Sequence, residues 1–479
     1  MHMYDVVICG NGVLGMATAR AIAMQDPLLR VAVVGPATRP GAASPAAGAM
    51  LGSFGEVTGP LLRTPSGRAR FATGRRAAEL WTSWLEGINA DLDRDSQLDA
   101  DLGTFLIRNS KSGTIEDENY VAIKQAVAEA GEPCEDIDAN EVPGLNPVED
   151  CRPSEALFLP REGSIDANRL MTTLARLIEQ SRRQTMVDGT VAELDIRDGR
   201  LAGVRLADDT VITSPQVVLA MGVGTQAVLD RIPELAARIP RMFAGVGTSL
   251  LLEVKRATFP HVVRTPNRSF ACGLHAVPRG GHLYCGATNN LSIEPRLATS
   301  PGQMTFLLDC VLDQLDQGLF TASLVRWSAG NRPVTVDTCP LIGPTSVDGL
   351  WLLTGTYRDG LFLSPLLSQH LARRLCGKPG LIGDEFLPER KPISVYTQEE
   401  ARADAVRHFL AMSSEHGMRL PRTGWHLMLP RFYQQMVDQV YDSLADQEFV
   451  LPPEFVGIAG VGKPSYFLDY FAQVRKAWS

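Results

Sequence analysis

Apolar residues fall into two kinds of pattern at the start of the chain. Val6, Val7 and Ile8 form a short run of β-branched residues, which predicts a strand buried on both faces. The Ala-rich run at residues 16–24 predicts a helix that packs closely on this strand. Residues 30–34 repeat the strand pattern. The order strand, helix, strand predicts an α/β domain at this end of the chain.

Further helices and strands follow in the first half of the chain. Helical periodicity predicts helices over residues 67–95, 119–130 and 167–181. Short apolar runs predict strands over residues 102–108, 190–195, 201–206 and 217–222. An Asp-Gly pair between the middle two is typical of a hairpin turn. Residues 159–166 are expected to form a turn that leads into the third helix.

The pattern changes twice in the second half of the chain. Between residues 240 and 330 strands predominate, and they are predicted over 247–254, 275–278 and 282–288. After residue 390 helices are predicted over 399–414, 429–444 and 466–478. The second of these helices has one apolar stripe, which is expected to pack against the body rather than to bind a partner. The stripe consists of Phe432, Met436, Val440 and Leu444.

A glycine motif separates the first strand from the first helix. Gly10 permits a tight turn, Gly12 lets a pyrophosphate approach the backbone, and Gly15 allows close contact between helix and strand. The free N–H groups at the start of the helix then face the phosphates. Val13 and Leu14 lie in the same turn. The motif predicts a bound dinucleotide and a Rossmann-like fold.

One part of this dinucleotide motif is missing. An acidic residue is expected at the end of the second strand, where it would hold the ribose hydroxyls, but the chain has Gly35 and Pro36 there. Ribose recognition must therefore come from elsewhere, and Arg39 and Ser44 are the candidates.

Small residues dominate the stretch from 39 to 52. Side chains of this size are suited to positions where the backbone lies against a flat ligand. Met50 and Leu51 are apolar residues that a solvated linker would not need. We therefore expect this stretch to line a cofactor ring.

Composition limits the class of protein. The 479 residues, of which 45% are hydrophobic, are enough for two or three domains. The net charge of −8, from 46 basic and 54 acidic residues, argues against nucleic acid as a partner. Eight cysteines show neither C-x-x-C spacing nor pairing with histidines, which predicts reduced thiols and no metal site. With no apolar run near 18 residues and no signal peptide, a cytoplasmic protein without membrane spans is expected.

Three linked motifs lie between residues 327 and 365. They read Gly-x-Arg-Pro at 330–333, Asp-x-x-Pro-x-Ile-Gly at 337–343, and Gly-x-x-Arg-x-Gly-x-x-x-x-Pro at 355–365. With the N-terminal glycine motif they resemble the flavin-dependent amine oxidases of the D-amino acid oxidase superfamily, most closely the glycine oxidase type. Sarcosine oxidases are also similar. The resemblance covers residues 1–390.

The resemblance implies a fold and a cofactor. The fold is α/β (α+β), with a Rossmann-like FAD-binding domain, an antiparallel-sheet substrate domain and a helical C-terminal extension. The FAD-binding domain would comprise residues 1–95, 156–238 and 325–390, the substrate domain 96–155 and 239–324, and the extension 391–479. The cysteine that binds flavin covalently in some sarcosine oxidases has no clear match, because Cys339 lies in the second motif instead. FAD is therefore expected to bind noncovalently.

The resemblance also implies site residues. Arg332 would make a two-pronged salt bridge to a substrate carboxylate, Arg358 would be a second pocket arginine, and Met50 would lie in the pocket. His275 stands where the family often carries a substrate-binding tyrosine, so it is either a pocket residue or an ordinary core histidine. The expected cofactor-binding residues are Gly10, Gly12, Val13, Leu14, Gly15, Ser44, Ala46, Ala47, Gly48, Met50, Val191, Ala220, Gly222, Arg332, Arg358, Asp359, Gly360 and Leu361.

The implied reaction is the oxidative deamination of a small amino acid or an N-substituted glycine. Hydride would pass from the carbon beside nitrogen to flavin N5, water would hydrolyse the imine, and O2 would reoxidise the flavin to give H2O2. One alternative is a dehydrogenase of the same fold that passes electrons to a quinone or a protein. Another is a catalytically silent FAD-binding subunit. The extension is expected to cap the substrate entrance or to build a subunit interface, as in a homo-oligomer.

Overall fold

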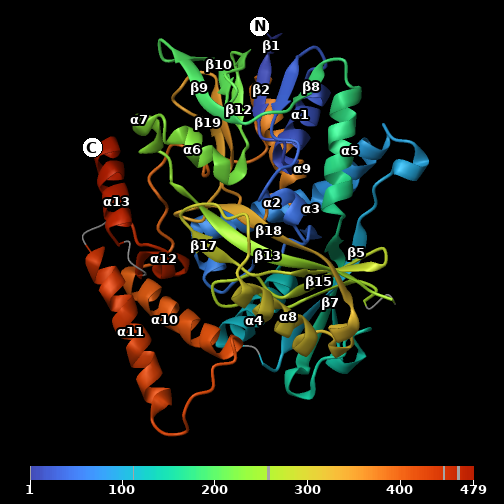
Figure 1. The fold of residues 1–479 in the computed structure, drawn as a ribbon, viewed down its shortest axis with the longest axis vertical. Helices are drawn as coiled ribbons and strands as arrows, with labels where there is room; N and C mark the ends of the chain where they lie inside the picture. Colours follow the sequence, from blue (N-terminus) through green and yellow to red (C-terminus); the bar gives the residue numbers. More distant parts are fainter. Residues whose placement is uncertain (1, 112, 256–258, 446–447, 461–463) are drawn as a thin grey trace.

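The computed structural model describes residues 2–111, 113–255, 259–445, 448–460 and 464–479 (Figure 1). Within these ranges the named strands form a six-stranded, a four-stranded and a ten-stranded sheet. The fold class predicted from the sequence is confirmed, with a Rossmann-like part, a larger sheet and C-terminal helices.

The six-stranded sheet carries the N-terminal motif. Its central strand β2 (Val6–Cys9) pairs in parallel with β3 (Val31–Val34) and β12 (Val217–Leu219). The outer strands are β8 (Gln184–Val187), β20 (Leu350–Thr354) and β19 (Leu341–Pro344), and only β19 runs antiparallel to its neighbour. A parallel sheet places the carboxyl ends of its strands at one edge, where ligands bind.

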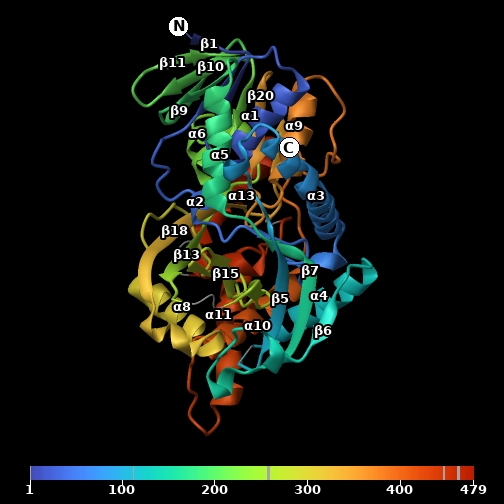
Figure 2. The same ribbon diagram turned by 90° about the vertical axis from the view of Figure 1, so that its right-hand side faces the viewer.

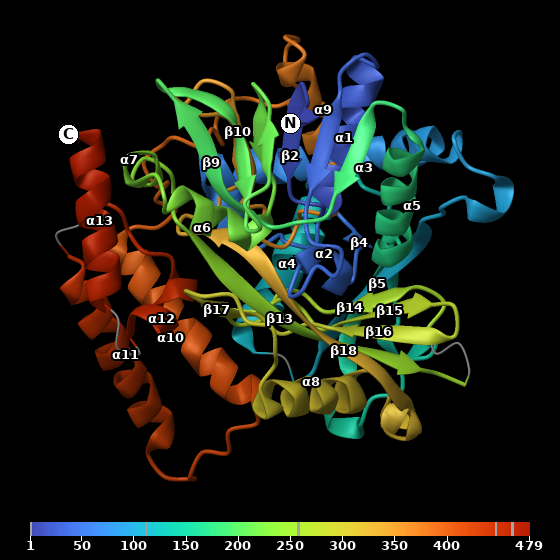
Figure 3. The same cartoon turned by 45° about the horizontal axis from the view of Figure 1, so that its top comes forward.

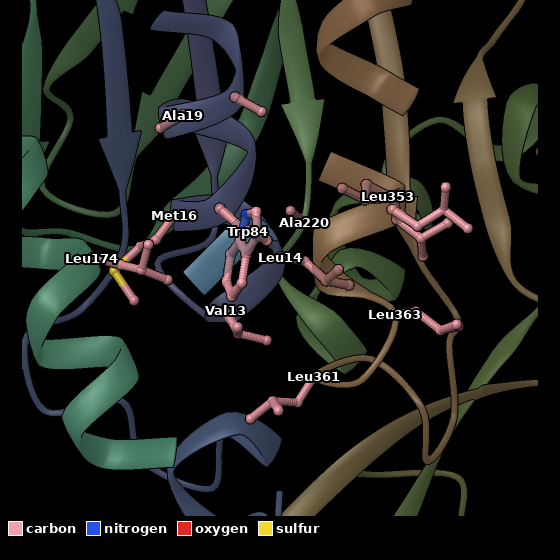
Figure 4. Close-up of a cluster of buried hydrophobic side chains, with 14 of the residues drawn as sticks. Val13, Leu14, Met16, Ala19, Trp84, Leu174, Ala220, Leu353, Leu361 and Leu363 are labelled. Carbon is pink, nitrogen blue, oxygen red and sulfur yellow. The ribbon is translucent and has the colours of Figure 1, made fainter. Parts of the chain in front are cut away.

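Both faces of β2 are covered, which explains why its sequence is continuously apolar. Val6 and Ile8 belong to a core with the helices α1 (Val13–Gln25), α3 (Pro65–Asn89), α5 (Ala167–Gln180) and α9 (Ser364–Leu375). Figure 4 shows buried side chains of α1 gathered with Trp84, Leu174 and Leu361. Val7 and Cys9 face the opposite core, beneath the hairpin β9 (Val191–Arg197) and β10 (Arg200–Leu206). Figure 3 shows α1 and α5 on one side of β2 and this hairpin on the other.

The ten-stranded sheet holds most of the remaining strands. Its longest pairing joins β13 (Met242–Glu253) to β18 (Ser323–Thr335). The other strands used below are β4 (Met50–Leu51), β5 (Asp101–Asn109), β7 (Pro153–Ser164), β14 (Val262–Arg264), β15 (His275–Arg279), β16 (His282–Gly286) and β17 (Asn290–Ser292). Its pairs are mainly antiparallel, but β14 runs parallel to β5.

The prediction of a turn at residues 159–166 is wrong for most of these residues. These residues continue β7 as far as Ser164, paired with β5 and β4. Leu157 and Leu159 alternate on the buried face of the strand, so tertiary pairing overrides the local turn signal of Pro160 and Gly163. Asp166 then caps α5 by accepting hydrogen bonds from the N–H groups of Asn168 and Arg169.

The C-terminal extension is helical, as predicted. It contains α10 (Gln398–Glu415), α11 (Trp425–Ser443), the short α12 (Val456–Gly460) and α13 (Pro464–Trp478). These helices share a hydrophobic core with Phe243 of β13 and Val334 of β18. Figure 1 shows the extension along one side of the molecule. In the described chain, no helix combines the length and apolarity needed to cross a membrane.

The predicted stripe of α11 is only partly buried. Val440 and Leu444 are buried, but Phe432 has 60% of its surface exposed. The buried face of α11 is instead set by Leu429 and Tyr433, which belong to the core of the extension. The expectation that the whole stripe packs against the body is therefore wrong at Phe432.

Candidate active site

Two adjoining cavities lie at the carboxyl ends of the parallel strands. The long cavity, about 510 Å³, runs from the Gly10 turn to Arg332. The small cavity, about 110 Å³, continues past Arg332 among β4, β7 and β14 to β16. The residues that line both are Ala47, Tyr284, Arg332, Arg358 and Leu361. The two cavities therefore meet at a shared wall of these side chains.

The structure places nearly all the expected site residues around these cavities. Those on the long cavity are Gly10, Gly12, Val13, Leu14, Ser44, Ala46, Ala47, Val191, Ala220, Gly222, Arg332, Arg358, Gly360 and Leu361. Gly48, Met50, His275 and Asp359 line the small cavity. Gly15 lines neither, because it faces the strand. A Cβ added at Gly15 would lie 1.9 Å from the carbonyl oxygen of Gly10, so its role is close packing.

The Gly10 turn leaves backbone exposed to the long cavity. Gly10 has φ of 121°, and a Cβ there would lie 2.2 Å from the carbonyl oxygen of Ala220. Helix α1 starts at Val13 without a side-chain cap hydrogen bond from its N-cap residue, Gly12, and with no acidic residue in its first turn. The Val13 N–H donates to Ser44 Oγ at 3.2 Å. The positive end of the helix dipole is thus directed at the cavity with no carboxylate to neutralise it.

The far end of the long cavity lacks the usual acid. A Cβ at Gly35 would lie 2.5 Å from Cγ of Asn11, whose side chain fills this corner and donates to the carbonyl oxygen of Pro36. Arg39 lines the same end, and its buried Nε has no hydrogen-bond partner in the described chain. Burial lowers the pKa of Arg39. Of the two candidates for ribose recognition, Arg39 lies at this end, whereas Ser44 lies at the start of α1.

These features fit a dinucleotide. Gly10 and Gly12 line the cavity, the start of α1 faces it without an acidic side chain in its first turn, and the buried Nε of Arg39 has no partner in the described chain. The volume falls within the range of cofactor sites, which is roughly 300–1,000 Å³.

Three arginines line the small cavity, and two of them have acidic partners. Arg264 Nη2 donates to Glu162 at 2.9 Å, and both side chains are almost fully buried, with 4% and 6% exposed. Arg358 donates to Glu56 at 3.0 Å and to the Tyr357 hydroxyl at 3.0 Å. Each of these guanidinium charges is therefore balanced within the protein.

Arg332 is the arginine that has no acidic partner among the described residues. Its Nη1 donates to the carbonyl oxygen of Thr288 at 3.1 Å and to Asn289 Oδ1 at 3.2 Å. Asn289 in turn donates to the Tyr357 hydroxyl at 2.6 Å. The guanidinium is held by neutral groups, so its charge is free to bind an anion.

Two glycines of β13 make room for Arg332. In the register of β13 and β18, Arg332 lies opposite Gly245. A Cβ at Gly247 would lie 2.2 Å from Nη1 of Arg332. The need for glycine at these two positions was not predicted from the sequence. Two glycines separated by one residue in a strand, as in Gly245-Val246-Gly247, nevertheless indicate that another group lies close to that face of the strand.

His275 lies in the small cavity as a neutral imidazole. Its Nδ1 donates to the carbonyl oxygen of Gly273 at 2.9 Å, because a carbonyl can only accept. Burial lowers the pKa of His275 to about 4. The ring stacks on Tyr284, with centroids 5.8 Å apart. Nε2 therefore carries a lone pair rather than a proton at neutral pH.

Tyr284 is a wall residue that the sequence analysis missed. Its hydroxyl donates to the carbonyl oxygen of Ala46 at 2.9 Å, which ties β16 to the small-residue stretch. It lies directly opposite Val277 in the pairing of β15 and β16. Glu56, Glu162 and Arg264 were also missed, because each belongs to a segment far from its partner in the sequence.

Asp359 is the remaining acid of the small cavity. Burial, together with the nearby Glu56 carboxylate, raises the pKa of Asp359 to about 7. The nearest cation is Arg70, with 3.9 Å between Nη2 and Oδ2. Asp359 is thus the group whose charge changes near neutral pH in this cavity.

A third cavity, of about 100 Å³, adjoins the small cavity and is lined in part by the C-terminal extension. It shares Glu56, Asn267 and Arg358 with the small cavity. The extension contributes Val395, Tyr396, Pro452 and Glu454 to its wall. The extension therefore reaches the site and does not only cover the body.

Comparisons with known proteins bear on this site. The family model DAO, FAD dependent oxidoreductase, matches residues 5–374. Glycine oxidase of Pseudomonas aeruginosa is 25% identical over 385 residues, which cover 79% of this chain and 96% of that protein. The crystal structure of glycine oxidase from Geobacillus kaustophilus matches with a TM-score of 0.68 and 21% identity, over 82% of this chain and all of that chain. D-amino acid dehydrogenase of Methylobacterium nodulans is 28% identical over 231 residues, 48% of this chain and 53% of that protein.

Proposed function

The chain belongs to the family of FAD-dependent oxidoreductases that matches residues 5–374, and from this premise we propose that it oxidises a small amine that carries a carboxylate. The proposal depends most on Arg332. An uncompensated guanidinium at the junction of the two cavities is suited to a carboxylate, which its planar fork binds with two charge-assisted hydrogen bonds.

The long cavity would hold FAD. The Gly10 turn and the start of α1 would bind the pyrophosphate, and Val191 and Arg39 would contact the adenosine end. None of the residues that the structure places around the long cavity is a cysteine, and Cys339 lines the third cavity instead. We therefore propose noncovalent binding. When bound, FAD supplies an acceptor for a hydride from the carbon beside the substrate nitrogen.

The protein's own groups then orient the substrate. Arg332 would fix the carboxylate, and the narrow cavity would keep the amine close to the shared wall. His275, as a neutral imidazole, would accept a hydrogen bond at Nε2 rather than repel a cationic amine. A dedicated base is not required for a substrate that binds as the neutral amine.

The charges of the small cavity favour a substrate with one carboxylate. Arg264 and Arg358 are already balanced by Glu162 and Glu56. Arg332 supplies one further positive charge, which a single carboxylate neutralises while Asp359, the remaining acid of the cavity, is protonated. Small amino acids and N-substituted glycines meet this condition.

An anaerobic titration tests the proposal. The protein is purified with FAD, and amino acids and N-alkyl glycines are added in the absence of O2 while the flavin absorption is followed. We expect at least one of these to bleach the flavin. If none does while FAD stays bound, the chain is a silent FAD-binding subunit.

The group that accepts electrons from the reduced flavin is tested separately. We propose O2 as the acceptor, on the likeness to glycine oxidases, and H2O2 as the product. The likeness to a D-amino acid dehydrogenase favours the alternative of another acceptor. Readmitting O2 to the bleached protein separates them, because an oxidase regains its colour within the turnover time and releases one H2O2 per flavin.

The extension would control access to the small cavity. Tyr396 lines the third cavity, so a Tyr396→Ala variant should accept bulkier amines, seen as a lower KM for them relative to the smallest substrate. Trp478→Ala is the matched control, since Trp478 also belongs to the extension but packs over Arg238. An unchanged substrate preference in Tyr396→Ala would contradict this role.

A further inference from the structure

The turn between α10 and α11 carries features that the proposed reaction does not use. We call residues 416–432 the hairpin tip. Figures 1 and 2 show the loop at its start protruding beyond the rest of the molecule in two perpendicular views. Every residue from 416 to 428 is exposed.

The hairpin tip is apolar at its surface. Six large apolar side chains of the tip have between 40% and 60% of their surface exposed. They are Met418, Leu420, Trp425, Leu427, Met428 and Phe432. A cluster of this kind on a protruding surface marks an interaction site rather than a solvated turn.

The apolar side of α11 is broader at the start of the helix than the part of it that is covered. Leu429 and Tyr433 pack into the core of the extension, whereas Trp425, Met428 and Phe432, at spacings of three and four residues, lie beside them and are exposed. The described residues therefore leave part of this apolar side uncovered.

The charges of the hairpin tip all have one sign. No acidic residue occurs between Glu415 and Asp438, whereas Arg419, Arg422 and Arg431 are present and exposed. None of these three has an ion-pair partner in the described chain. The protein as a whole carries a net charge of −8, so this cluster is a local exception.

We propose that the hairpin tip docks on the surface of an anionic phospholipid membrane. Tryptophan, phenylalanine and leucine side chains enter the boundary between headgroups and acyl chains, and arginines bind the phosphates of the headgroups. The exposed apolar side chains and the positive charge of the tip together complement a surface of negatively charged headgroups above acyl chains. The docking is interfacial and does not require a helix that spans the bilayer.

Vesicle flotation tests this proposal on the full chain with FAD bound. Vesicles of equal parts phosphatidylglycerol and phosphatidylcholine are compared with vesicles of phosphatidylcholine alone, at low and at high salt. We expect binding to the anionic vesicles that is at least about tenfold tighter and weakens with salt.

Two sets of substitutions separate the apolar and the charged contributions. Trp425→Ser with Met428→Ser and Phe432→Ser should reduce binding to anionic vesicles by at least about tenfold, and so should Arg419→Glu with Arg422→Glu. Leu324→Ser with Val325→Ser is the control, because these side chains are equally exposed on the body and should leave binding unchanged. Circular dichroism checks that each variant is folded.

Three results would overturn the proposal. The first is a full chain that does not float with anionic vesicles, and the second is flotation that neither set of tip substitutions reduces. The third is an oligomer in size-exclusion chromatography that the tip substitutions dissociate, without any vesicle binding, which would make the tip a contact between copies of this chain.

Discussion

The long cavity and the small cavity are built from different groups. The long cavity is bounded mainly by backbone and small residues, with Gly10, Gly12 and the start of α1 at one end. The wall of the small cavity contains six charged side chains, of which Arg264 and Arg358 are each paired with an acid. In the proposed function, the cofactor would contact backbone that the small residues leave accessible, and the substrate would bind to the one charge that the protein leaves unbalanced.

The largest loss of function is expected at the backbone of the long cavity, because the cofactor would no longer bind. Gly10→Ala would bring a Cβ to 2.2 Å from the Ala220 carbonyl oxygen at a φ of 121°, so the turn must move. We expect protein that is purified without yellow colour and is destabilised by about 3 kcal/mol. Absorption at the flavin band and urea unfolding measure both. Gly302→Ala is the control, since a Cβ there meets nothing within 4 Å.

The buried ion pair of the small cavity comes next, with the largest loss of stability but no direct loss of the cofactor. Glu162→Ala leaves the Arg264 charge buried without its partner and should lower the free energy of unfolding by roughly 3–5 kcal/mol. Asp348→Ala removes the partner of Arg200 in an exposed pair and should leave the unfolding midpoint unchanged. Equal effects of the two substitutions in urea unfolding would show that the small cavity is not organised by its charges.

The pH dependence of stability gives a smaller effect. The pKa of His275 falls from 6.5 to about 4 on folding, so between these values the unfolded chain binds the proton and the folded chain does not. Stability is therefore complete above pH 6.5 and falls by about 2 kcal/mol between pH 7 and 5. His275→Gln should remove this part of the pH dependence in thermal unfolding. His370, whose pKa is also lowered to about 4, remains as a background in both proteins.

The smallest effect is expected at Asp359. Below its pKa of about 7 this side chain is neutral, and above it the added negative charge opposes a carboxylate in the same cavity. The Kd of glycolate, which has no amine to titrate, should rise by less than about tenfold between pH 6 and 8. Asp359→Asn should make the Kd independent of pH in this range. A rise that persists in the variant would assign it to another group.

The contrast between the long and the small cavity also explains which parts of the site could be predicted from the sequence. The Gly10 turn and β2 depend on neighbouring residues, so a local pattern is sufficient to predict them. The pairs in the small cavity join residues that lie 102 positions apart for Glu162 and Arg264, and 302 apart for Glu56 and Arg358. Glu162 and Arg264 meet only because β5 pairs with both β7 and β14, and Glu56 reaches Arg358 only through the tertiary fold.

The sequence predictions and the structure also differ where tertiary contacts decide the local conformation or the buried face of an element. Pro160 and Gly163 are typical of a turn, yet their segment forms a strand that pairs with β5. The stripe on α11 has helical spacing, but spacing alone does not show which face a neighbouring helix covers. In the structure, α10 and α11 share a core that includes Leu429 and Tyr433, and Phe432 remains exposed.

The central claim is that Arg332 holds a carboxylate beside the bound cofactor. The most direct measurement is a titration of the yellow protein with acetate and with acetamide, followed by the flavin spectrum. The account predicts that acetate binds, that acetamide does not, and that Arg332→Ala weakens acetate by about 100-fold while the exposed Arg326→Ala on the same strand has no effect. Equal binding of acetate by the wild-type protein and Arg332→Ala would contradict it.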